Sequence, residues 1–321
     1  MSEDEIRSHK DVFSRLAIGL LTYLLVSETL GFAGAYLVSK INRELLASYN
    51  FSLIFSSVIQ YGMALPVFYL VIRKMPSCRP TNVRTSVKSV FGYMMVGMLF
   101  MYVGNAVSTG LMTRIEAMLG REVENSISSL LMGSDYIYAV VFVGLIGPVA
   151  EELIFRKLLI DRLSPYGNAT AILFTSIIFG LFHGNLYQFF YAFALGVIFA
   201  YIYVRTGKII YSTLLHVFIN LFCGVLPAYL MSLLGEGDQS SVGYLAENML
   251  PMMLITIYEL LMLAMTVAGV VILIRSLRSI RLDKGSVRFP KGRAGDVIFF
   301  NVGTVALITV SILVVALNTF M

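Results

Sequence analysis

The sequence predicts an all-α protein, built as a polytopic bundle of about eight or nine transmembrane helices. Of its 321 residues, 58% are hydrophobic and 13% are charged, and the mean hydropathy is +0.81. A soluble domain of this length carries about a quarter charged residues. The composition therefore excludes a soluble enzyme, a disordered chain and an ordinary nucleic-acid-binding protein.

Nine segments are apolar over about 20 residues, the length that a helix needs to cross a membrane. They are 16–38, 51–72, 90–112, 136–155, 169–184, 187–204, 209–231, 249–274 and 297–319. The fifth is the shortest, so eight spans is the alternative count. We expect the first to be an anchor, because charges of both signs precede it and no small-residue cleavage site follows.

The positions of Lys and Arg predict the orientation, because these residues collect in cytoplasmic loops. With the N-terminus inside, the cytoplasmic segments hold 20 of the 24 Lys and Arg residues. We therefore expect a multi-pass protein of the cell membrane with a cytoplasmic N-terminus. The net charge of +5 then reflects topology and not affinity for nucleic acid.

Three regions follow from this layout. Residues 1–135 hold the N-terminal helices and an outer segment, 113–135, in which apolar residues among acids predict an amphipathic surface helix. Residues 136–231 hold the polar motifs described next. Residues 232–321 hold the C-terminal helices and a basic cytoplasmic loop. Cys78 and Cys223 match no disulfide or zinc pattern, and we interpret both as structural.

Ionisable residues within the spans are costly and point to functional sites. They are Glu28, Glu151, Glu152, His183, His216 and Glu259. Glu28 and Glu259 are isolated, and we expect each to be a packing or hydrogen-bonding residue. The other four fall within 66 residues of sequence.

The first polar motif is Glu-Glu-Leu-Ile-Phe-Arg, residues 151–156. Glu152 and Arg156 are i,i+4 neighbours that can pair along one helix face, whereas Glu151 points about 100° away. Pro148 either opens the helical hydrogen-bond ladder or restarts the helix, and both would favour an ionised Glu151. An interfacial Glu–Arg cluster that closes a span would show the same pattern.

Each of the other two motifs carries one histidine. His183 ends Phe-Gly-Leu-Phe-His, and an interfacial, hydrogen-bonded histidine is the alternative. His216 and Asn220 share a face of the seventh span, where a polar pair that bridges two helices is the alternative.

Helix lengths predict which of these residues meet. Glu151 and His183 lie 13 and 15 residues from the turn 164–168, so the two can face each other about 20 Å above it. His216 is only 8 residues from Lys208. This leaves a depth mismatch of about 10 Å, which needs tilted helices or a buried turn, and a hairpin 158–172 that reaches beyond the membrane would also help.

Glu-Glu-x-x-x-Arg, Phe-x-x-x-His and His-x-x-x-Asn, in this order on successive hydrophobic segments, resemble the CPBP family. This family comprises CAAX proteases and bacteriocin-processing or immunity proteins, also called Abi intramembrane proteases. The resemblance covers residues 147–222 with their flanks, and no motif position departs from the pattern.

The resemblance implies an intramembrane endopeptidase with a CAAX-protease-like core at 136–231. Glu151 would activate water together with His183. His216 and Asn220 would stabilise the oxyanion. Glu152 and Arg156 would form a supporting pair. The expected partners are a membrane-associated peptide or protein substrate and the lipid bilayer, without nucleic acid.

Zinc is the alternative basis for the chemistry, because two histidines and a glutamate are an ordinary zinc set with one open position. The close-packed His-Glu-x-x-His arrangement is absent. Asn220 is a poor zinc ligand and a good oxyanion donor, so we expect no cofactor.

Two other functions fit the same residues. A non-proteolytic bacteriocin-immunity or scaffold protein would keep the fold and use the polar cavity only to hold a partner. A proton-coupled transporter would use membrane carboxylates and histidines as a relay. Transporters usually show internal repeats, and none is visible in this sequence.

Overall fold

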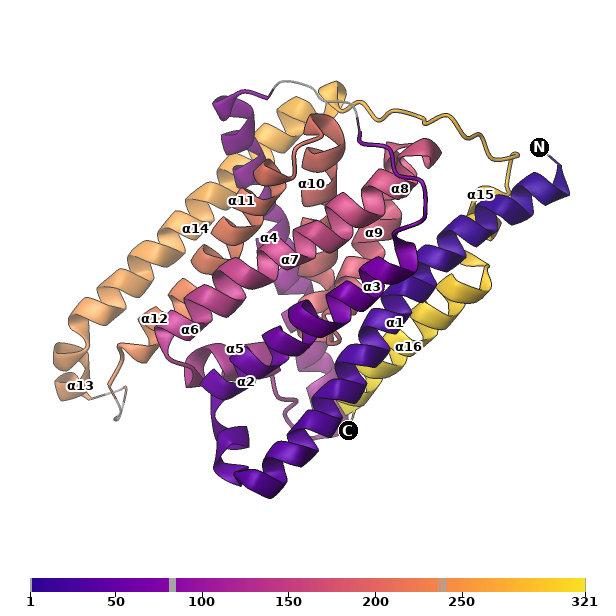
Figure 1. The fold of residues 1–321 in the computed structure, drawn as a ribbon. Helices are drawn as coiled ribbons and strands as arrows, with labels where there is room; N and C mark the ends of the chain where they lie inside the picture. The colour runs from indigo at the N-terminus through magenta and orange to yellow at the C-terminus, as the bar shows by residue number, and fades with distance from the viewer. Residues whose placement is uncertain (1, 81–84, 236, 238, 240, 321) are drawn as a thin grey trace.

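The computed structural model describes residues 2–80, 85–235, 237, 239 and 241–320, and these residues form helices and no strand. The helices run side by side as a bundle, with the N-terminus at one end and the C-terminus at the other (Figure 1). The predicted all-α transmembrane bundle is therefore confirmed.

Sixteen α-helices are present in the described residues. They are α1 (Glu3–Ile41), α2 (Tyr49–Ser57), α3 (Leu65–Ile72), α4 (Val87–Leu119), α5 (Ser126–Gly133), α6 (Tyr136–Tyr138), α7 (Gly147–Glu152), α8 (Asp161–Leu163), α9 (Asn168–Phe182), α10 (Leu186–Thr206), α11 (Ile209–Ile219), α12 (Leu226–Ser232), α13 (Val242–Glu247), α14 (Met249–Ser276), α15 (Ala294–Phe299) and α16 (Val302–Phe320). Short 3₁₀ and π-helical stretches join several of them into longer continuous helices.

Eight continuous helices of the described chain are long and apolar enough to cross a membrane. They are Glu3–Ile41, Tyr49–Ile72, Lys88–Leu119, Tyr136–Tyr166, Leu186–Thr206, Ile209–Ser232, Met249–Ser279 and Val302–Phe320. The ninth predicted span, 169–184, forms α9, which has only 15 residues. Its length of about 22 Å is less than a hydrocarbon core of about 30 Å. By length and apolar character the described chain thus has eight candidate spans, with α9 as a short additional helix between the fourth and the fifth.

The helix α10 lies at the centre of the bundle, and α14 lies at its edge. Half of the most apolar window of α10 is buried, against 17% for α14. Close contact between α9 and α10 depends on two glycines. A Cβ atom would lie 3.0 Å from the Phe189 carbonyl oxygen at Gly180 and 3.2 Å from the Ser176 backbone at Gly196. This contact holds α9, and the histidine at its end, against the central helix.

Three prolines follow π-helical stretches of the bundle. The pairs are Val58–Ala64 with Pro66, Ala139–Ile146 with Pro148, and Asn220–Val225 with Pro227. Proline cannot donate to the carbonyl four residues earlier and its ring clashes with it. The wider π turn accommodates the ring, and such turns are frequent at functional sites. Pro148 therefore opens the hydrogen-bond ladder, as one of the two predictions had it, without ending the helix.

The prediction of one amphipathic surface helix over 113–135 is wrong. The helix α4 continues to Leu119 and ends at Gly120, whose φ of 65° is left-handed. After a loop, α5 begins as a separate helix, and Ile127 and Leu131 on it line an internal cavity. Periodicity alone cannot tell a face that covers a cavity from one that lies on lipid.

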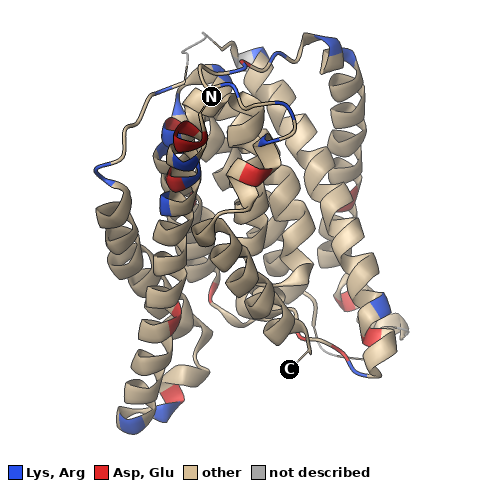
Figure 2. Cartoon of the chain, turned by 90° about the vertical axis from the view of Figure 1, so that its right-hand side faces the viewer, with Lys and Arg blue, Asp and Glu red and all other residues tan. Residues whose placement is uncertain are grey.

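Lys and Arg gather mainly at the end of the bundle that holds the N-terminus (Figure 2). Fewer basic residues occur at the opposite end, where α5 and the C-terminus lie (Figures 1 and 2). The expected cytoplasmic location of the N-terminus rests on this asymmetry and stays a prediction.

Candidate active site

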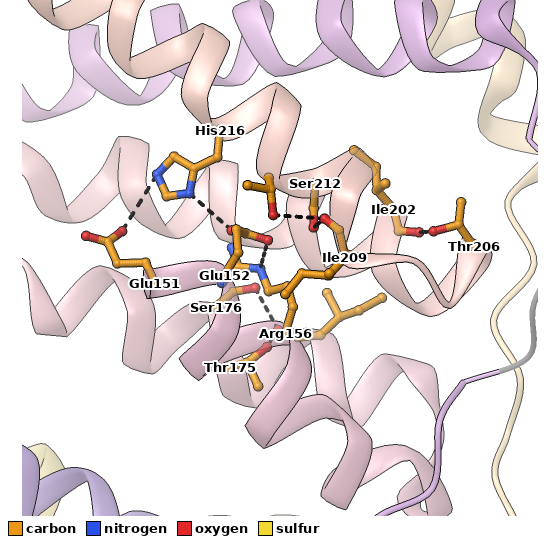
Figure 3. Close-up of polar contacts among 12 residues, drawn as sticks. Glu151, Glu152, Arg156, Thr175, Ser176, Ile202, Thr206, Ile209, Ser212 and His216 are labelled. Atoms are coloured by element: carbon orange, nitrogen blue, oxygen red, sulfur yellow. Dashed lines mark hydrogen bonds and ion pairs between the residues drawn. The ribbon is translucent and has the colours of Figure 1, made fainter. Parts of the chain in front are cut away.

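Glu152, Arg156 and His216 form a polar cluster inside the bundle, and each is 3% exposed or less (Figure 3). Arg156 Nε lies 3.3 Å from Glu152 Oε2, and His216 Nδ1 lies 3.1 Å from Glu152 Oε1. The pairing expected from the i,i+4 spacing is therefore present. Because the two partners take different oxygens, the Glu152 carboxylate is held between two helices and fixes the ring of His216.

Aromatic rings surround Arg156. Its guanidinium carbon lies 4.7 Å from the ring centre of Phe179, 5.3 Å from that of Phe199 and 6.0 Å from that of Phe155. Its three guanidinium nitrogens have no hydrogen-bond partner among the described residues. Cation–π contacts and the charge of Glu152 therefore stabilise this buried cation.

Glu151 lies on a different face of the same helix, and it differs from Glu152 in exposure and in hydrogen bonding. Its side chain is 26% exposed, and its Oε2 lies 3.7 Å from His216 Nε2. No described residue forms a hydrogen bond with this oxygen. His216 thus stands between the two carboxylates, with one ring nitrogen toward each (Figure 3).

His183 is positioned by the turn at the end of α9. Its Nδ1 lies 2.8 Å from the Phe179 carbonyl oxygen. Because a carbonyl can only accept, Nδ1 carries a proton, and Nε2 of the neutral ring is an acceptor. Gly184 completes the turn with a left-handed φ of 67°, and Asn318 donates to its carbonyl at 2.9 Å.

Asn220 owes its position to Pro148. The Gly147 N–H donates to the Phe142 carbonyl five residues back. In the same register the donor to Val143 would be Pro148, which has no N–H. Asn220 Nδ2 donates to this Val143 carbonyl at 3.0 Å.

A cavity of about 670 Å³ brings three of the predicted residues to one space. Glu151, His183 and Asn220 line it, whereas His216 lies behind its wall. The lining also includes residues of α1, α5 and α16. All three regions of the chain therefore build this cavity, and the motif-bearing region does not enclose it alone.

The predicted depth mismatch of His216 is resolved by the hairpin after Glu151. The Tyr203 hydroxyl donates to Asp161 Oδ1 at 2.6 Å, so Asp161 lies level with the end of α10. The turn beyond it projects further and is bound by the basic loop, because Val287 N–H donates to the Pro165 carbonyl at 2.9 Å. His216 therefore reaches both carboxylates, at 3.1 Å from Glu152 Oε1 and 3.7 Å from Glu151 Oε2.

The donors of the zinc alternative are His183, His216 and Glu151. No group of three or more His, Cys, Asp or Glu side chains in the described chain is arranged to hold a metal ion. Glu151 and His216 approach each other, and His183 keeps Nε2 available because its Nδ1 is bound to a backbone carbonyl.

Sequence reasoning missed the aromatic part of the site. Phe179 contacts His183 edge-on at 4.9 Å and His216 at 5.8 Å between ring centres. The ring of Phe199 stacks on His216 at 4.6 Å. The Phe of the Phe-x-x-x-His motif was a visible signal for the first. Nothing in the sequence around Phe199 distinguishes it from an ordinary core residue.

Comparison with known proteins bears on the same segment. A family model described as "Type II CAAX prenyl endopeptidase Rce1-like" matches residues 133–222, which contain all three motifs. "Putative membrane peptidase YdiL" of Bacillus subtilis (strain 168) is 29% identical over 170 residues, or 52% of this chain and 68% of that protein. No solved structure gives a significant match. These matches and the three motifs support the resemblance of residues 133–222 to the CAAX protease (CPBP) family of membrane proteases.

Proposed function

We propose that the protein is an intramembrane endopeptidase that hydrolyses a peptide bond in a membrane-associated peptide or protein. The observation that supports this most directly is the state of Glu151. It is a carboxylate on the wall of a large cavity, its side chain is 26% exposed, and no other described residue forms a hydrogen bond with its oxygens. A general base needs such an oxygen within reach of water.

Glu151 and His183 activate the water in this proposal. A Glu151 oxygen accepts a proton from the water as the water oxygen bonds to the peptide carbonyl carbon. His183 orients that water through Nε2, the nitrogen that the Phe179 carbonyl leaves available. The proton on Glu151 then passes to the leaving nitrogen as the C–N bond breaks, which returns Glu151 to its carboxylate form.

His216 and Asn220 stabilise the oxyanion in this proposal. Asn220 uses one amide N–H on Val143 and keeps a second N–H at the cavity. His216 is held through Nδ1 by Glu152, and its Nε2 faces the side of Glu151, which lines the cavity. Donors fixed before the reaction are worth about 3–4 kcal/mol each in such sites.

Glu152 and Arg156 are positioning residues, because both are fully buried and their charges pair with each other. They hold the His216 ring in one orientation, which an unsupported imidazole at a helix surface would not keep. We further propose that the reaction needs no metal. Dialysis of the purified protein against EDTA and 1,10-phenanthroline should leave the rate of peptide cleavage unchanged, and loss of cleavage restored by zinc would contradict this.

The substrate and the activity can be tested together by comparing membrane peptidomes. Three sets of cells are compared, which make the wild-type protein, the Glu151→Gln variant or the Glu259→Gln variant. Each variant lacks one carboxylate of the wild type. We expect one or a few uncut peptides to accumulate with Glu151→Gln only. If the three peptidomes are the same, the chain is a non-proteolytic member of the family and the proposal is wrong.

A further inference from the structure

Glu28 is a carboxylate within a membrane span that neither the family motifs nor the proposed reaction uses. It lies on α1, its side chain is exposed, and it lines the same cavity as Glu151. No hydrogen bond or ion pair joins it to any other residue that the structure describes. Such a group is costly inside a membrane unless it pairs, so its partner is expected outside the chain.

Two serine hydroxyls on the cavity wall also lack partners. Ser311 of α16 is 2% exposed, and the Oγ atoms of Ser27 and Ser311 form no hydrogen bond in the described chain. Both residues line the cavity. A buried hydroxyl left unpaired costs about 1–3 kcal/mol. Other hydroxyls in this bundle donate to their own helix, as Thr319 does at 2.8 Å.

The two helices that carry these groups run side by side in the same direction (Figure 1). Gly303 N–H donates to Ser14 Oγ at 3.0 Å, which sets the register between them. Asn318 follows Gly303 by 15 residues, and the same step from Ser14 ends next to Glu28. Glu28 and Asn318 therefore lie at similar depth on one polar wall.

The cavity is acidic. Its lining holds Glu28 and Glu151, and no Lys or Arg among the described residues. Two carboxylates in a partly enclosed space of low dielectric constant attract a cation and disfavour an anion. The unpaired group that complements this wall is a positively charged side chain.

The exposed part of the lining shows from which end a substrate arrives. It includes Ser128 and Met132 of α5, Met231 at the end of α12, and Asn318. The helix α5 and the C-terminus lie at the end of the bundle opposite the N-terminus (Figure 1). This is also the end with few Lys and Arg residues (Figure 2).

The distance from Glu28 to the reaction centre follows from α1. Tyr23 packs against Phe182, with ring centres 5.7 Å apart, next to His183. Glu28 lies five residues farther along α1, about 7.5 Å toward the exposed end. An extended peptide advances about 3.3 Å per residue. A side chain that reaches Glu28 therefore belongs to a residue about two to four positions from the bond beside His183.

We propose that Glu28, with the hydroxyl of the adjacent Ser27, is a specificity site that binds a Lys or Arg side chain of the substrate. The substrate arrives from the end of the bundle with few basic residues. This inference rests on the proposed protease function and names its substrate class, an apolar membrane-associated peptide with a basic residue close to the cleaved bond.

The test uses the purified full-length protein in detergent micelles. The probes are synthetic apolar peptides of one sequence that carry Lys, norleucine or Glu at each position in turn. We expect the Lys peptide to exceed the norleucine peptide about tenfold in kcat/KM at one position, and the Glu peptide to be poorest. Glu28→Gln should remove the preference, and Glu28→Lys should transfer it to the Glu peptide.

The matched control is Glu259→Gln, because Glu259 is an exposed acid on α14 that does not line the cavity. It should keep the wild-type preference. The specificity site is wrong if the Lys, norleucine and Glu peptides are cleaved equally well. It is also wrong if the Glu28→Gln protein still prefers the Lys peptide.

Peptide binding to Glu151→Gln protein separates this inference from the proposed reaction. If no peptide is cleaved but the Lys peptide still binds about tenfold more tightly through Glu28, the cation site stands and the protease function fails. If binding to Glu151→Gln protein shows no charge preference, the cation site is wrong whether or not cleavage occurs.

Discussion

The buried cluster of Glu152, Arg156 and His216 lies next to the cavity wall, and the two regions differ in how their carboxylates are paired. In the cluster, Glu152 binds both Arg156 and His216 and no part of it is exposed. On the wall, the side chain of Glu151 is 26% exposed and forms no hydrogen bond with another described residue. Adjacent residues of one helix thus serve as a fixed support and as an available group. The contrast suggests that pairing, more than residue type, separates positioning groups from reacting groups.

The largest expected effect is the loss of the cation in the cluster. Arg156→Met leaves the buried charge of Glu152 without its partner, which should lower the free energy of unfolding by about 3–5 kcal/mol. Unfolding in detergent with a chemical denaturant measures this. The double variant Glu152→Gln/Arg156→Met leaves neither charge and should regain most of the loss. Equal stability of the single and double variants would show that the pair is not coupled.

On the cavity wall, removal of an oxyanion donor should affect the rate and not the fold. Asn220→Ala is expected to lower kcat about 10²- to 10³-fold with little change in KM. Asn105→Ala is the control, since Asn105 is an amide that lines the same cavity outside the motifs. If both variants lower kcat equally, the amide of Asn220 has no special role.

A smaller effect is expected at the turn that presents His183. Gly184 has a left-handed φ of 67°, so Gly184→Ala should cost about 1–2 kcal/mol of stability. It should also lower kcat by misplacing the neighbouring imidazole. Gly184→Asn is the matched variant, because Asn tolerates this conformation better. If neither substitution changes stability or kcat, the Gly184 turn does not position His183.

The smallest effect is expected for an ion pair near the surface, between Lys10 and Asp296. Lys10 Nζ lies 2.7 Å from Asp296 Oδ1. This hydrogen bond, with the nearby charges of Lys10 and Arg293, lowers the pKa of Asp296 below 3.8. A lowered folded-state pKa gives stability that is present above pH 3.8 and is lost as the pH falls through the folded value.

Asp296→Asn should therefore reduce the unfolding temperature slightly at pH 7, and the difference from wild type should shrink below pH 4. Thermal unfolding in detergent at several pH values checks this. A difference that grows in acid would contradict the sign of the shift.

Much of the fold could be predicted because membrane spans are local features. Apolar length marks eight long helices and a short one, and the Pro148 and i,i+4 patterns correctly describe the helix that holds Glu151 and Glu152. The error over 113–135 has a physical cause. A helix that covers a cavity and one that lies on lipid both present an apolar face.

The site was less predictable, because its geometry depends on contacts between distant segments. The family resemblance implied one site for Glu151, His183, His216 and Asn220, and the cavity lining includes all of these but His216. That His216 would stand between two carboxylates depends on the projection of the hairpin after Asp161 and on the Phe199 ring beneath it. Side-chain packing of this kind leaves no periodic trace in a sequence.

The most direct test of the central claim compares two variants of adjacent residues, Glu151→Gln and Glu152→Gln. Cleavage of an accumulated peptide and unfolding in detergent should be measured on both. We predict that Glu151→Gln unfolds like the wild type and cleaves nothing, while Glu152→Gln loses stability and retains a reduced rate. A Glu151→Gln protein that is folded and cleaves at the wild-type rate would contradict the account.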